Sequence, residues 1–368
     1  MAKTKRQKVV VAVSGGVDSA VSAALLKKTG FDVIGVFMRF WQDPLTKGWN
    51  RCCSPEAEKR ARLVASYLRI PFYVFNLEKE FKKRVVNYFL KEYKADSTPN
   101  SCVVCNREIK FGLFLEKALA MGTDFVATGH YARLRREIKN PKSQIPNFRL
   151  FRGKDKEKDQ SYFLWQLSQK QLSKIIFPLG DLTKKEVISL AKKLTPPVLN
   201  AKESQEVCFI KTTINDFLIK YLKGTKKGKI LDSKGKTLGI HAGLPFYTIG
   251  QRKGIGLAGG PYYVLDKDPK RNILIVSRNK RDLDRRKLIA GNINWISGKK
   301  PRLPLRVNAK IRYRHRLASA IIRKQQIKRG KENLISVEFK KPQRAITPGQ
   351  SVVFYRGEEV LGGGIIKC

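Results

Sequence analysis

The chain has 368 residues, enough to bury a sizeable core and to form two or three domains. Its formal net charge of +46 predicts attraction to a polyanion, usually a nucleic acid, although a generally lysine-rich composition would give the same charge. No apolar stretch is long enough to span a membrane, and the six cysteines lack the dispersed spacing of a disulfide-rich secreted protein. A cytoplasmic protein without a membrane partner is therefore expected.

A nucleotide site is predicted at the start of the chain. The apolar strand Val9–Val13 is followed by the string SGGVDS (residues 14–19) and by a helix over Ala20–Leu26. Adjacent glycines let backbone amides close around an anion, and the helix directs its positive end to the same place. The loop has no Gly-Lys-Ser/Thr ending, so amides, two serine hydroxyls and the helix dipole would hold phosphate. The alternative is an ordinary glycine turn with Asp18 or Ser19 as helix cap.

Apolar runs alternate with amphipathic stretches over roughly the first two hundred residues, which predicts a doubly wound parallel α/β sheet. Strands are expected at Val9–Val13, Val33–Met38, Phe72–Phe75 and Phe125–Thr128, and helices at Pro55–Leu68, Glu78–Tyr93 and Arg107–Met121. The loop after the first strand would then lie at the carboxyl edge of the sheet, where such folds bind ligands.

Short strands and glycine turns dominate the rest of the chain. Residues from Gly224 onward predict a small β-rich middle domain, and the tail from about Leu288 predicts a small β-barrel. Strands of the tail are expected at Arg306–Tyr313, Leu334–Phe339, Gln350–Tyr355 and Val360–Ile366. The expected domains are residues 1–210, 211–284 and 285–368.

Cys105 is a candidate nucleophile, because it directly precedes a predicted helix whose first turns carry Arg107 and Lys110. A helix N-terminus and two cations favour the thiolate over the thiol. The competing interpretation is a structural zinc site, in which Cys102 and Cys105 have knuckle spacing and Cys52 and Cys53 complete a tetrad. These residues alone leave both interpretations open.

Other candidates have weaker signals. Cys208, in Glu203–Ile210, is by default a buried small hydrophobe, although its polar neighbours allow a loop position. His130 follows a predicted strand at the ligand edge, or it simply satisfies a turn. The string KDQSYF (residues 158–163) fits an ordinary helix start capped by Asp159. The basic run Arg312–Arg316 fits either a solvated strand edge or a surface for phosphates and a stacked base.

Taken together, the chain resembles the bacterial tRNA-specific 2-thiouridylases, a family of pyrophosphate-loop ATPases, over essentially its whole length. The shared strings are SGGVDS, the Phe37-Met38 strand end, CNREIKF, ATGHYAR, KDQSYFL, VCFI, YTIGQRKG at residues 247–254, IRYR from Ile311, TPGQ from Thr347 and GGGII from Gly362. The resemblance implies an adenine nucleotide hydrolase-like catalytic domain, a small central domain and a C-terminal barrel that binds tRNA.

The resemblance also implies individual sites. ATP contacts fall on Ala12, Val13, Ser14, Gly15, Gly16, Val17, Asp18, Ser19, Met38 and Gly129. The nucleophile falls on Cys105 and the persulfide-bearing cysteine on Cys208. The tRNA contacts fall on Asn100, Ser101, Cys102, His130, Lys158, Asp159, Gln160, Arg312, Tyr313 and Gln350.

The implied activity is ATP-dependent 2-thiolation of the wobble uridine of tRNA. ATP with Mg²⁺ would adenylate the C2 oxygen, and Cys208 would carry sulfur from a sulfur relay protein or a cysteine desulfurase. Attack of Cys105 on Cys208 would leave a disulfide between them.

One departure from the family concerns Cys102, because a family version has Pro-Asn-Pro-Asp where this chain has Pro99-Asn100-Ser101-Cys102. The extra thiol would act as a resolving cysteine or as a cluster ligand. One rival hypothesis is therefore an iron-sulfur cluster on Cys102, Cys105 and Cys208. The other is a non-catalytic tRNA-binding protein with a zinc knuckle.

Overall fold

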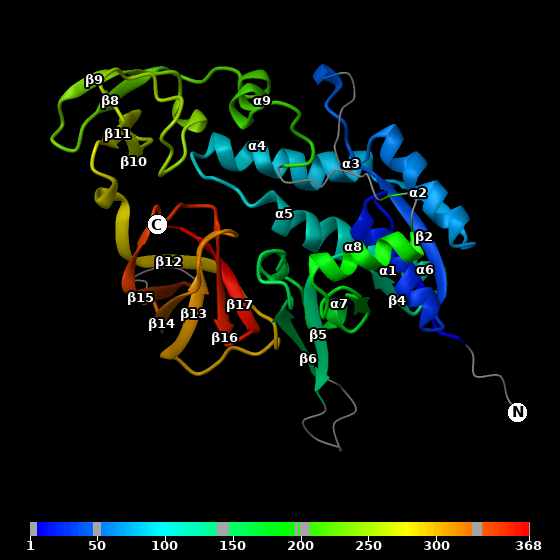
Figure 1. The fold of residues 1–368 in the computed structure, drawn as a ribbon. Coiled ribbons are helices and arrows are strands. Elements are labelled where there is room, and N and C mark those ends of the chain that lie inside the picture. Colours follow the sequence, from blue (N-terminus) through cyan, green and yellow to red (C-terminus); the bar gives the residue numbers. More distant parts are fainter. Residues whose placement is uncertain are drawn as a thin grey trace, which may run out of the picture.

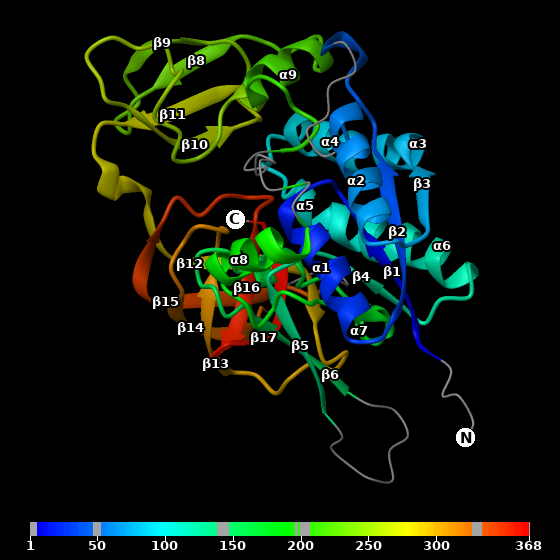
Figure 2. The same cartoon turned by 45° about the vertical axis from the view of Figure 1, so that its right-hand side comes forward.

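The computed structural model describes residues 6–46, 53–137, 147–195, 198, 207–325 and 333–367. The chain folds into an N-terminal α/β part, a small middle sheet and a C-terminal barrel (Figure 1). Figure 2 shows the middle sheet and the barrel on the same side of the α/β part.

The N-terminal part is built on a parallel sheet with helices on both faces. Within the described residues this sheet has five strands in the order β3-β2-β1-β4-β7, all paired in parallel. They are β1 (Lys8–Ala12), β2 (Asp32–Arg39), β3 (Phe72–Asn76), β4 (Phe125–Ala127) and β7 (Ile175–Ile176). The strand order reverses on either side of β1, so the predicted doubly wound α/β fold is confirmed.

Strand β1 is apolar on both faces because both faces are covered. Val9 belongs to the same apolar cluster as Ala20, Ala23 and Leu26 of α1 (Val17–Lys28), whereas Val10 shares a cluster with α6 (Phe114–Ala120). The other helices are α2 (Pro55–Tyr67), α3 (Glu78–Phe81), α4 (Asn87–Lys94), α5 (Ser101–Val104), α7 (Gln169–Leu172), α8 (Lys184–Leu194) and α9 (Ile214–Tyr221). Helices α1 and α8 lie side by side through a small shared cluster (Figures 1 and 2).

Two predicted helices begin earlier in the structure than the sequence indicated. Helix α1 begins at Val17 rather than Ala20, with Gly16 as its N-cap, so neither Asp18 nor Ser19 caps it. The helix predicted at Arg107–Met121 begins at Ser101, because π-helical turns over Cys105–Leu113 join α5 to α6. Similar turns over Lys82–Val86 join α3 to α4.

The middle part is a small mixed sheet in the order β10-β11-β8-β9 within the described residues. Its strands are β8 (Gly228–Leu231), β9 (Thr237–His241), β10 (Tyr263–Asp268) and β11 (Ile273–Ser277). The predicted β-rich central domain is therefore confirmed as a fold.

Six strands of the described C-terminal part form a barrel that closes through pairing of β12 with β17. The strands are β12 (Asp284–Trp295), β13 (Leu305–Lys310), β14 (Ala318–Lys324), β15 (Ile335–Arg344), β16 (Ser351–Arg356) and β17 (Glu359–Ile366). The strand predicted at Arg306–Tyr313 ends at Lys310. The basic run is therefore a turn between β13 and β14 rather than a strand edge, closed by a bond from His315 N to Arg312 O (3.1 Å).

A hairpin of the N-terminal part extends the barrel sheet, which the sequence did not indicate. Strands β5 (Ala132–Glu137) and β6 (Asn147–Arg152) pair with each other, and β6 also pairs with β17 through Leu150 and Phe151. The barrel is therefore joined to the nucleotide-binding part by main-chain hydrogen bonds. Among the described helices none has the length and apolar character required to cross a bilayer.

Candidate functional site

A cleft of about 2010 Å³ lies where the three parts meet. The predicted residues that line it are Ala12, Val13, Ser14, Gly16, Val17, Asp18, Ser19, Met38, Ser101, Cys102, Cys105, Gly129, His130, Lys158, Asp159, Gln160, Cys208 and Tyr313. Gly15, Asn100, Arg312 and Gln350 are not among the lining residues. Thr248 and Lys253 of the middle part also line the cleft; both belong to the shared string at residues 247–254, although neither was assigned a role from the sequence.

Hydrogen bonds within the loop after β1 fix the conformation of its backbone. Ser14 N donates to Ser19 Oγ (3.1 Å), which in turn donates to Gly16 O (3.0 Å). Gly15 has a φ of +73°, and a Cβ there would clash with the carbonyl of Ala57 in α2. Gly15 thus allows α2 to approach the loop closely, while the start of α1 points toward the cleft.

Asp18 is the carboxylate of this loop, and two residues from distant segments contact it. Tyr131 Oη and Lys184 Nζ both donate to Asp18 Oδ1, each at 2.7 Å. Gly129 crosses close above the same turn, since a Cβ there would lie 2.9 Å from Ser19 N. Neither Tyr131 nor Lys184 was predicted as a site residue, and no local sequence signal marks a contact across such separations.

The helix that carries Cys105 begins at Ser101 and is capped by Asn100, whose side chain accepts from Val103 N (3.4 Å). Cys102 is exposed in the first turn, whereas Cys105 is buried one turn later, with 9% of its surface exposed. The expectation that Cys105 lies at a helix N-terminus is therefore wrong. The helix dipole acts most strongly on Cys102, because the effect falls off within the first turn.

Cys208 lies half-buried in a turn on the same cleft. Its neighbour Phe209 is fully buried and packs against Phe81 and Phe89 at ring-centroid distances of 5.8 and 5.4 Å. Both Cys105 and Cys208 contribute to the same apolar cluster. An aromatic anchor thus fixes the end of a segment whose thiol is only half-buried.

The metal-site hypotheses find little support in the placement of the cysteines. Cys53 is buried and its Sγ accepts from Phe40 N (3.3 Å), while Cys52 lies outside the described residues. In the described ranges no three Cys, His, Asp or Glu side chains are grouped so as to hold a metal ion.

His130 lies at the floor of the cleft in an apolar setting. Its ring packs against Phe111 and Phe177, and Nδ1 is 2.7 Å from Thr128 Oγ1. Burial, assisted by the charge of Lys110, holds the pKa of His130 well below its usual value of 6.5. The imidazole is therefore neutral at pH 7.

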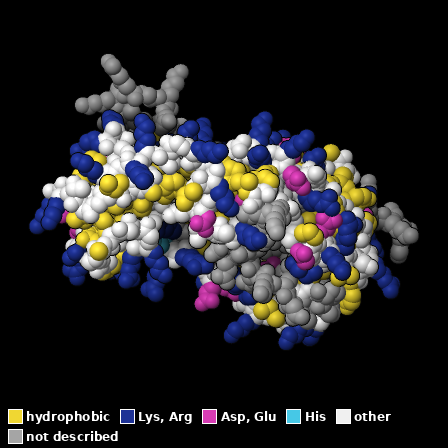
Figure 3. All heavy atoms as spheres, turned by 90° about the horizontal axis from the view of Figure 1, so that it is seen from above, with side chains coloured by type: hydrophobic (Ala, Val, Ile, Leu, Met, Phe, Trp, Pro, Cys, Tyr) yellow, Lys and Arg dark blue, Asp and Glu magenta, His cyan; other side chains and the backbone are white. Residues whose placement is uncertain are grey.

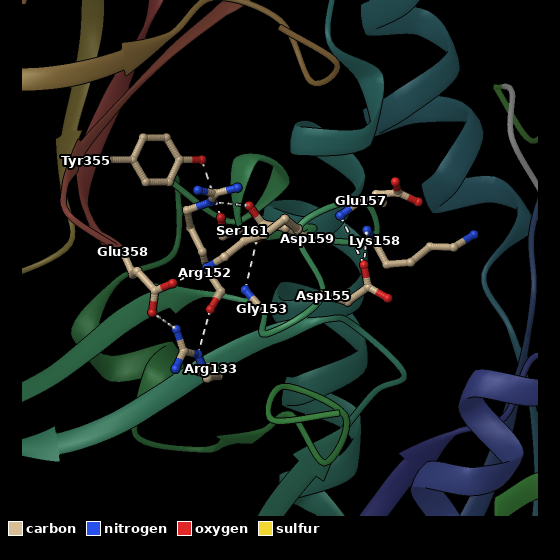
Figure 4. Close-up of polar contacts among 11 residues, drawn as sticks. Arg133, Arg152, Gly153, Asp155, Glu157, Lys158, Asp159, Ser161, Tyr355 and Glu358 are labelled. Atoms are coloured by element: carbon tan, nitrogen blue, oxygen red, sulfur yellow. Dashed lines mark hydrogen bonds and ion pairs between the residues drawn. The ribbon is translucent and has the colours of Figure 1, made fainter. Parts of the chain in front are cut away.

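The string Lys158-Asp159-Gln160 forms a tight turn around the buried carboxylate of Asp159 (Figure 4). Asp159 pairs with Arg152 Nε (2.9 Å) and accepts from Gly153 N and Ser161 N, both at 3.1 Å. Its carboxylate therefore orders the turn from within; the short 3-10 helix that follows, Ser161–Phe163, has Gln160 rather than Asp159 as its N-cap. Lys158 and Gln160 flank it on the cleft.

The basic turn after β13 contains residues in different environments. Arg312 is largely buried, and its Nη2 donates to Ile249 O (3.1 Å), Ala345 O (2.9 Å) and Thr347 Oγ1, so it joins the middle part to the barrel. Tyr313 packs on Phe163 with ring centroids 4.6 Å apart and lines the cleft. Arg314 is exposed and provides positive charge at the cleft.

Lysine and arginine side chains cover the face shown in Figure 3 and greatly outnumber acidic ones there. The positive charge is spread over this face rather than confined to one stripe, and such a surface attracts a polyanion.

Models of three protein families match the chain. They are described as a tRNA methyl transferase HUP domain over residues 7–212, a tRNA methyl transferase PRC-barrel domain over residues 215–278 and an aminomethyltransferase beta-barrel domain over residues 285–366.

Curated relatives match over nearly the full length. The chain is 46% identical to tRNA-specific 2-thiouridylase MnmA 2 of Thermoanaerobacter sp. (strain X514), with 98% of each chain covered. It is 47% identical to tRNA-specific 2-thiouridylase MnmA of Moorella thermoacetica, with 97% of this chain and 99% of the relative covered. The protein of that name from Clostridioides difficile is 44% identical, with 98% of each chain covered.

Proposed function

Because this chain belongs to the tRNA-specific 2-thiouridylase family, we propose that it uses ATP to replace the C2 oxygen of the wobble uridine of tRNA by sulfur. One observation carries the proposal. A single cleft joins a phosphate-binding loop, three cysteines, and basic and aromatic side chains of the barrel. These are the groups needed to activate a carbonyl, to transfer sulfur and to hold a nucleic acid.

The HUP-type domain and the loop at residues 12–19 support nucleotide binding. The triphosphate would lie on the amides at the start of α1, and the nucleoside would lie beside Met38 and Gly129. Asp18 supplies a carboxylate that would hold Mg²⁺, and the cation would supply positive charge to offset that of the phosphates. Attack of the uridine C2 oxygen on the α-phosphate releases pyrophosphate and makes AMP the later leaving group.

Sulfur transfer would use Cys208 and Cys105 in unequal roles. Cys208 carries a persulfide donated by a sulfur relay protein or a cysteine desulfurase. In one route the terminal sulfur attacks C2 and expels AMP, after which the Cys105 thiolate attacks Cys208 Sγ and releases the thiolated base. In the other, Cys105 attacks first, and the released hydrosulfide attacks C2. Both routes form a Cys105–Cys208 disulfide, which a dithiol reductant must then reduce.

The tRNA would approach the cleft from its basic side. Lys158, Gln160, Tyr313 and Arg314 line the cleft beside the two cysteines. The wobble base must leave the anticodon stack to reach this pocket.

We further propose domain boundaries near residues 210 and 284 and a cytoplasmic location.

The rival hypotheses are not favoured. A cluster on Cys102, Cys105 and Cys208 would require three thiols around one centre, and the described side chains show no such group. A non-catalytic tRNA-binding protein would not need the open phosphate loop or an accessible cysteine on the same cleft.

The proposal is tested by incubating the purified protein with tRNA, Mg²⁺, ATP and a labelled persulfide donor. We expect 2-thiouridine at the wobble position, with AMP, pyrophosphate and thiolated base formed in equal amounts. Nucleoside mass spectrometry measures the product, and an anaerobic absorption spectrum tests for a cluster. ADP as the product, or no thiolated base, would refute the proposal.

A further inference from the structure

The phosphate loop has no lysine of its own, yet the structure places one beside it from 166 residues further along the chain. Lys184 Nζ lies 2.7 Å from Asp18 Oδ1, and both residues line the cleft. Only 14% of the Lys184 side chain is exposed, compared with 33% of the Asp18 side chain. A shielded ammonium group therefore lies at the place where the loop would receive phosphate.

The backbone of Lys184 is held firmly, so its side chain starts from a defined point. It is the first residue of α8, which Thr183 caps with a reciprocal bond to Glu186. Lys184 N also donates to Asp155 Oδ2 (2.9 Å). The other oxygen of Asp155 accepts from Glu157 N (3.0 Å) and Lys158 N (3.1 Å), as Figure 4 shows for the last two residues. The helix start is thus tied to the turn that precedes the cleft residues Lys158 and Gln160.

A purely structural role explains this ion pair poorly. A partly buried pair gains little net stability, because desolvation offsets most of the Coulomb attraction, and an apolar residue of similar volume often serves as well. Asp18 is also the residue that a phosphate-bound cation would use. Pairing with Lys184 balances the negative charge of the Asp18 carboxylate while no nucleotide is present.

We propose that Lys184 is the phosphate-binding lysine of this site and that it exchanges Asp18 for the triphosphate when the nucleotide binds. This inference rests on the proposed use of ATP. Mg²⁺ bound with the nucleotide competes for the Asp18 carboxylate, and the released ammonium group pairs with phosphate oxygens. A lysine there favours departure of pyrophosphate, because it stabilises the negative charge that develops on the leaving group.

The proposed exchange predicts how single substitutions change nucleotide affinity, and this can be measured with nucleotides that do not react. The probes are AMP and a non-hydrolysable α,β-methylene analogue of ATP, and calorimetry measures binding to the full-length protein. With Mg²⁺ present, Lys184→Met should weaken analogue binding by about ten-fold or more, as expected for loss of a charge-assisted contact. AMP binding should change by less than about two-fold, and Lys184→Arg should retain most of the affinity for the analogue.

Lys185→Met is the matched control. Lys185 is the next residue of the same helix turn, is exposed and does not line the cleft. The variant removes the same charge from the chain, so it should leave both affinities unchanged. Equal weakening by both variants would show a general electrostatic effect and would overturn the proposal.

Asp18→Asn distinguishes the proposed exchange, in which Lys184 leaves Asp18 for the triphosphate, from an ion pair that persists when the nucleotide binds. Without Mg²⁺ this variant should bind the analogue more tightly than the wild type, since Lys184 no longer has a competing carboxylate. With Mg²⁺ it should bind more weakly. The metal-free gain should vanish in Asp18→Asn/Lys184→Met, which a double-mutant cycle measures.

Unchanged analogue affinity in Lys184→Met, or an equal loss for AMP and the analogue, would refute the role of Lys184. Failure of the wild-type protein to thiolate tRNA would instead refute the proposed function. The two failures are distinguishable, because the binding measurements require no tRNA and no sulfur donor.

Discussion

Gln350 of the barrel donates from Nε2 to the backbone carbonyl of Thr98, 3.1 Å away, across 252 positions of sequence. The same nitrogen donates to Pro99 O (3.2 Å), and Thr98 N donates back to Pro348 O (2.9 Å). Gly349 completes the contact, since a Cβ there would lie 2.7 Å from Thr98 O. The loop Thr347–Gln350 therefore holds the segment that leads into the cysteine-bearing helix.

Gln350→Ala should lower the rate of thiolation by about ten-fold, because the helix start would be less well ordered, while tRNA affinity should change by less than about two-fold. Single-turnover assays and filter binding measure the two effects. Gln343→Ala is the control, since Gln343 Nε2 also donates to two carbonyls but only within its own strand. A parallel loss of tRNA affinity in Gln350→Ala would show that Gln350 contacts tRNA directly.

Gly15→Ala should abolish ATP-dependent AMP formation and destabilise the protein. Its Cβ would clash with the carbonyl of Ala57 in α2, in addition to the strain of a φ of +73°. Gly122 has the same φ of +73°, but a Cβ there would have no atom within 4 Å, so Gly122→Ala should cost only about 1 kcal/mol of unfolding free energy. Urea denaturation compares the two variants, and equal destabilisation would contradict the steric argument.

Replacing Arg312 should have a different effect from replacing Arg314 and Arg316, the other two arginines of the basic turn. Arg314 and Arg316 are exposed on the cleft, so replacing both by alanine should weaken tRNA binding. The slope of the logarithm of affinity against the logarithm of salt concentration should fall by the amount expected for about two phosphate contacts. Arg312→Ala should instead lower the thermal stability, because three acceptors lose their donor. Salt titrations of tRNA binding and thermal unfolding separate these effects. Weaker tRNA binding by Arg312→Ala with no loss of thermal stability would contradict the prediction and show that Arg312 faces the tRNA.

Stability should decline as the pH falls through about 6.5, the usual histidine pKa in an unfolded chain. Burial lowers the pKa of all three histidines, His130, His241 and His315, so below this pH the unfolded chain binds more protons than the folded one. The pKa values of Glu186 and Glu358 are lowered to about 2, so their contribution is lost only at lower pH.

His130→Gln isolates one of these contributions. The variant should lose less stability than the wild type as the pH falls from above to below about 6.5, as measured by urea denaturation. An identical loss in both proteins would show that His130 takes up its proton equally in the folded and unfolded states.

The cysteines should separate by function. Cys208→Ser should accept no labelled sulfur, whereas Cys105→Ser should accept it and fail to thiolate tRNA. Cys53→Ser should retain most activity, because Cys53 is buried against Phe40 and does not line the cleft. Cys102→Ser decides whether the exposed thiol of the first helix turn is required. Full activity of Cys105→Ser, or labelled sulfur on Cys53, would contradict the assignment.

The sequence predicted features that arise from local patterns. The strand Val9–Val13, the glycine loop and the helices near Pro55 and Glu78 were recognisable, because each depends on periodicity or on a short string. The start of α5 was missed, because Asn100 caps a helix interrupted by π-helical turns, which no simple period describes.

Features that depend on long-range pairing could not be predicted. The contact of Lys184 with Asp18 and the buried position of Arg312 arise only when segments far apart in sequence come together. The strand predicted at Arg306–Tyr313 was extended too far, into the turn after β13, because the alternating pattern of its first residues gives no signal for where the strand ends. Most of the predicted site residues thus line the cleft, whereas the contacts that hold the cleft together were not predicted.

Strand β17 belongs to two structures at once. Its later residues close the barrel with β12, whereas Glu359 and Val360 pair with β6 of the nucleotide-binding part. A fragment ending near residue 284 would therefore leave β6 as an unprotected sheet edge, the kind of surface on which chains associate with one another. Pairing with β17 covers this edge, so we expect a chain that lacks the barrel to associate with itself through β6.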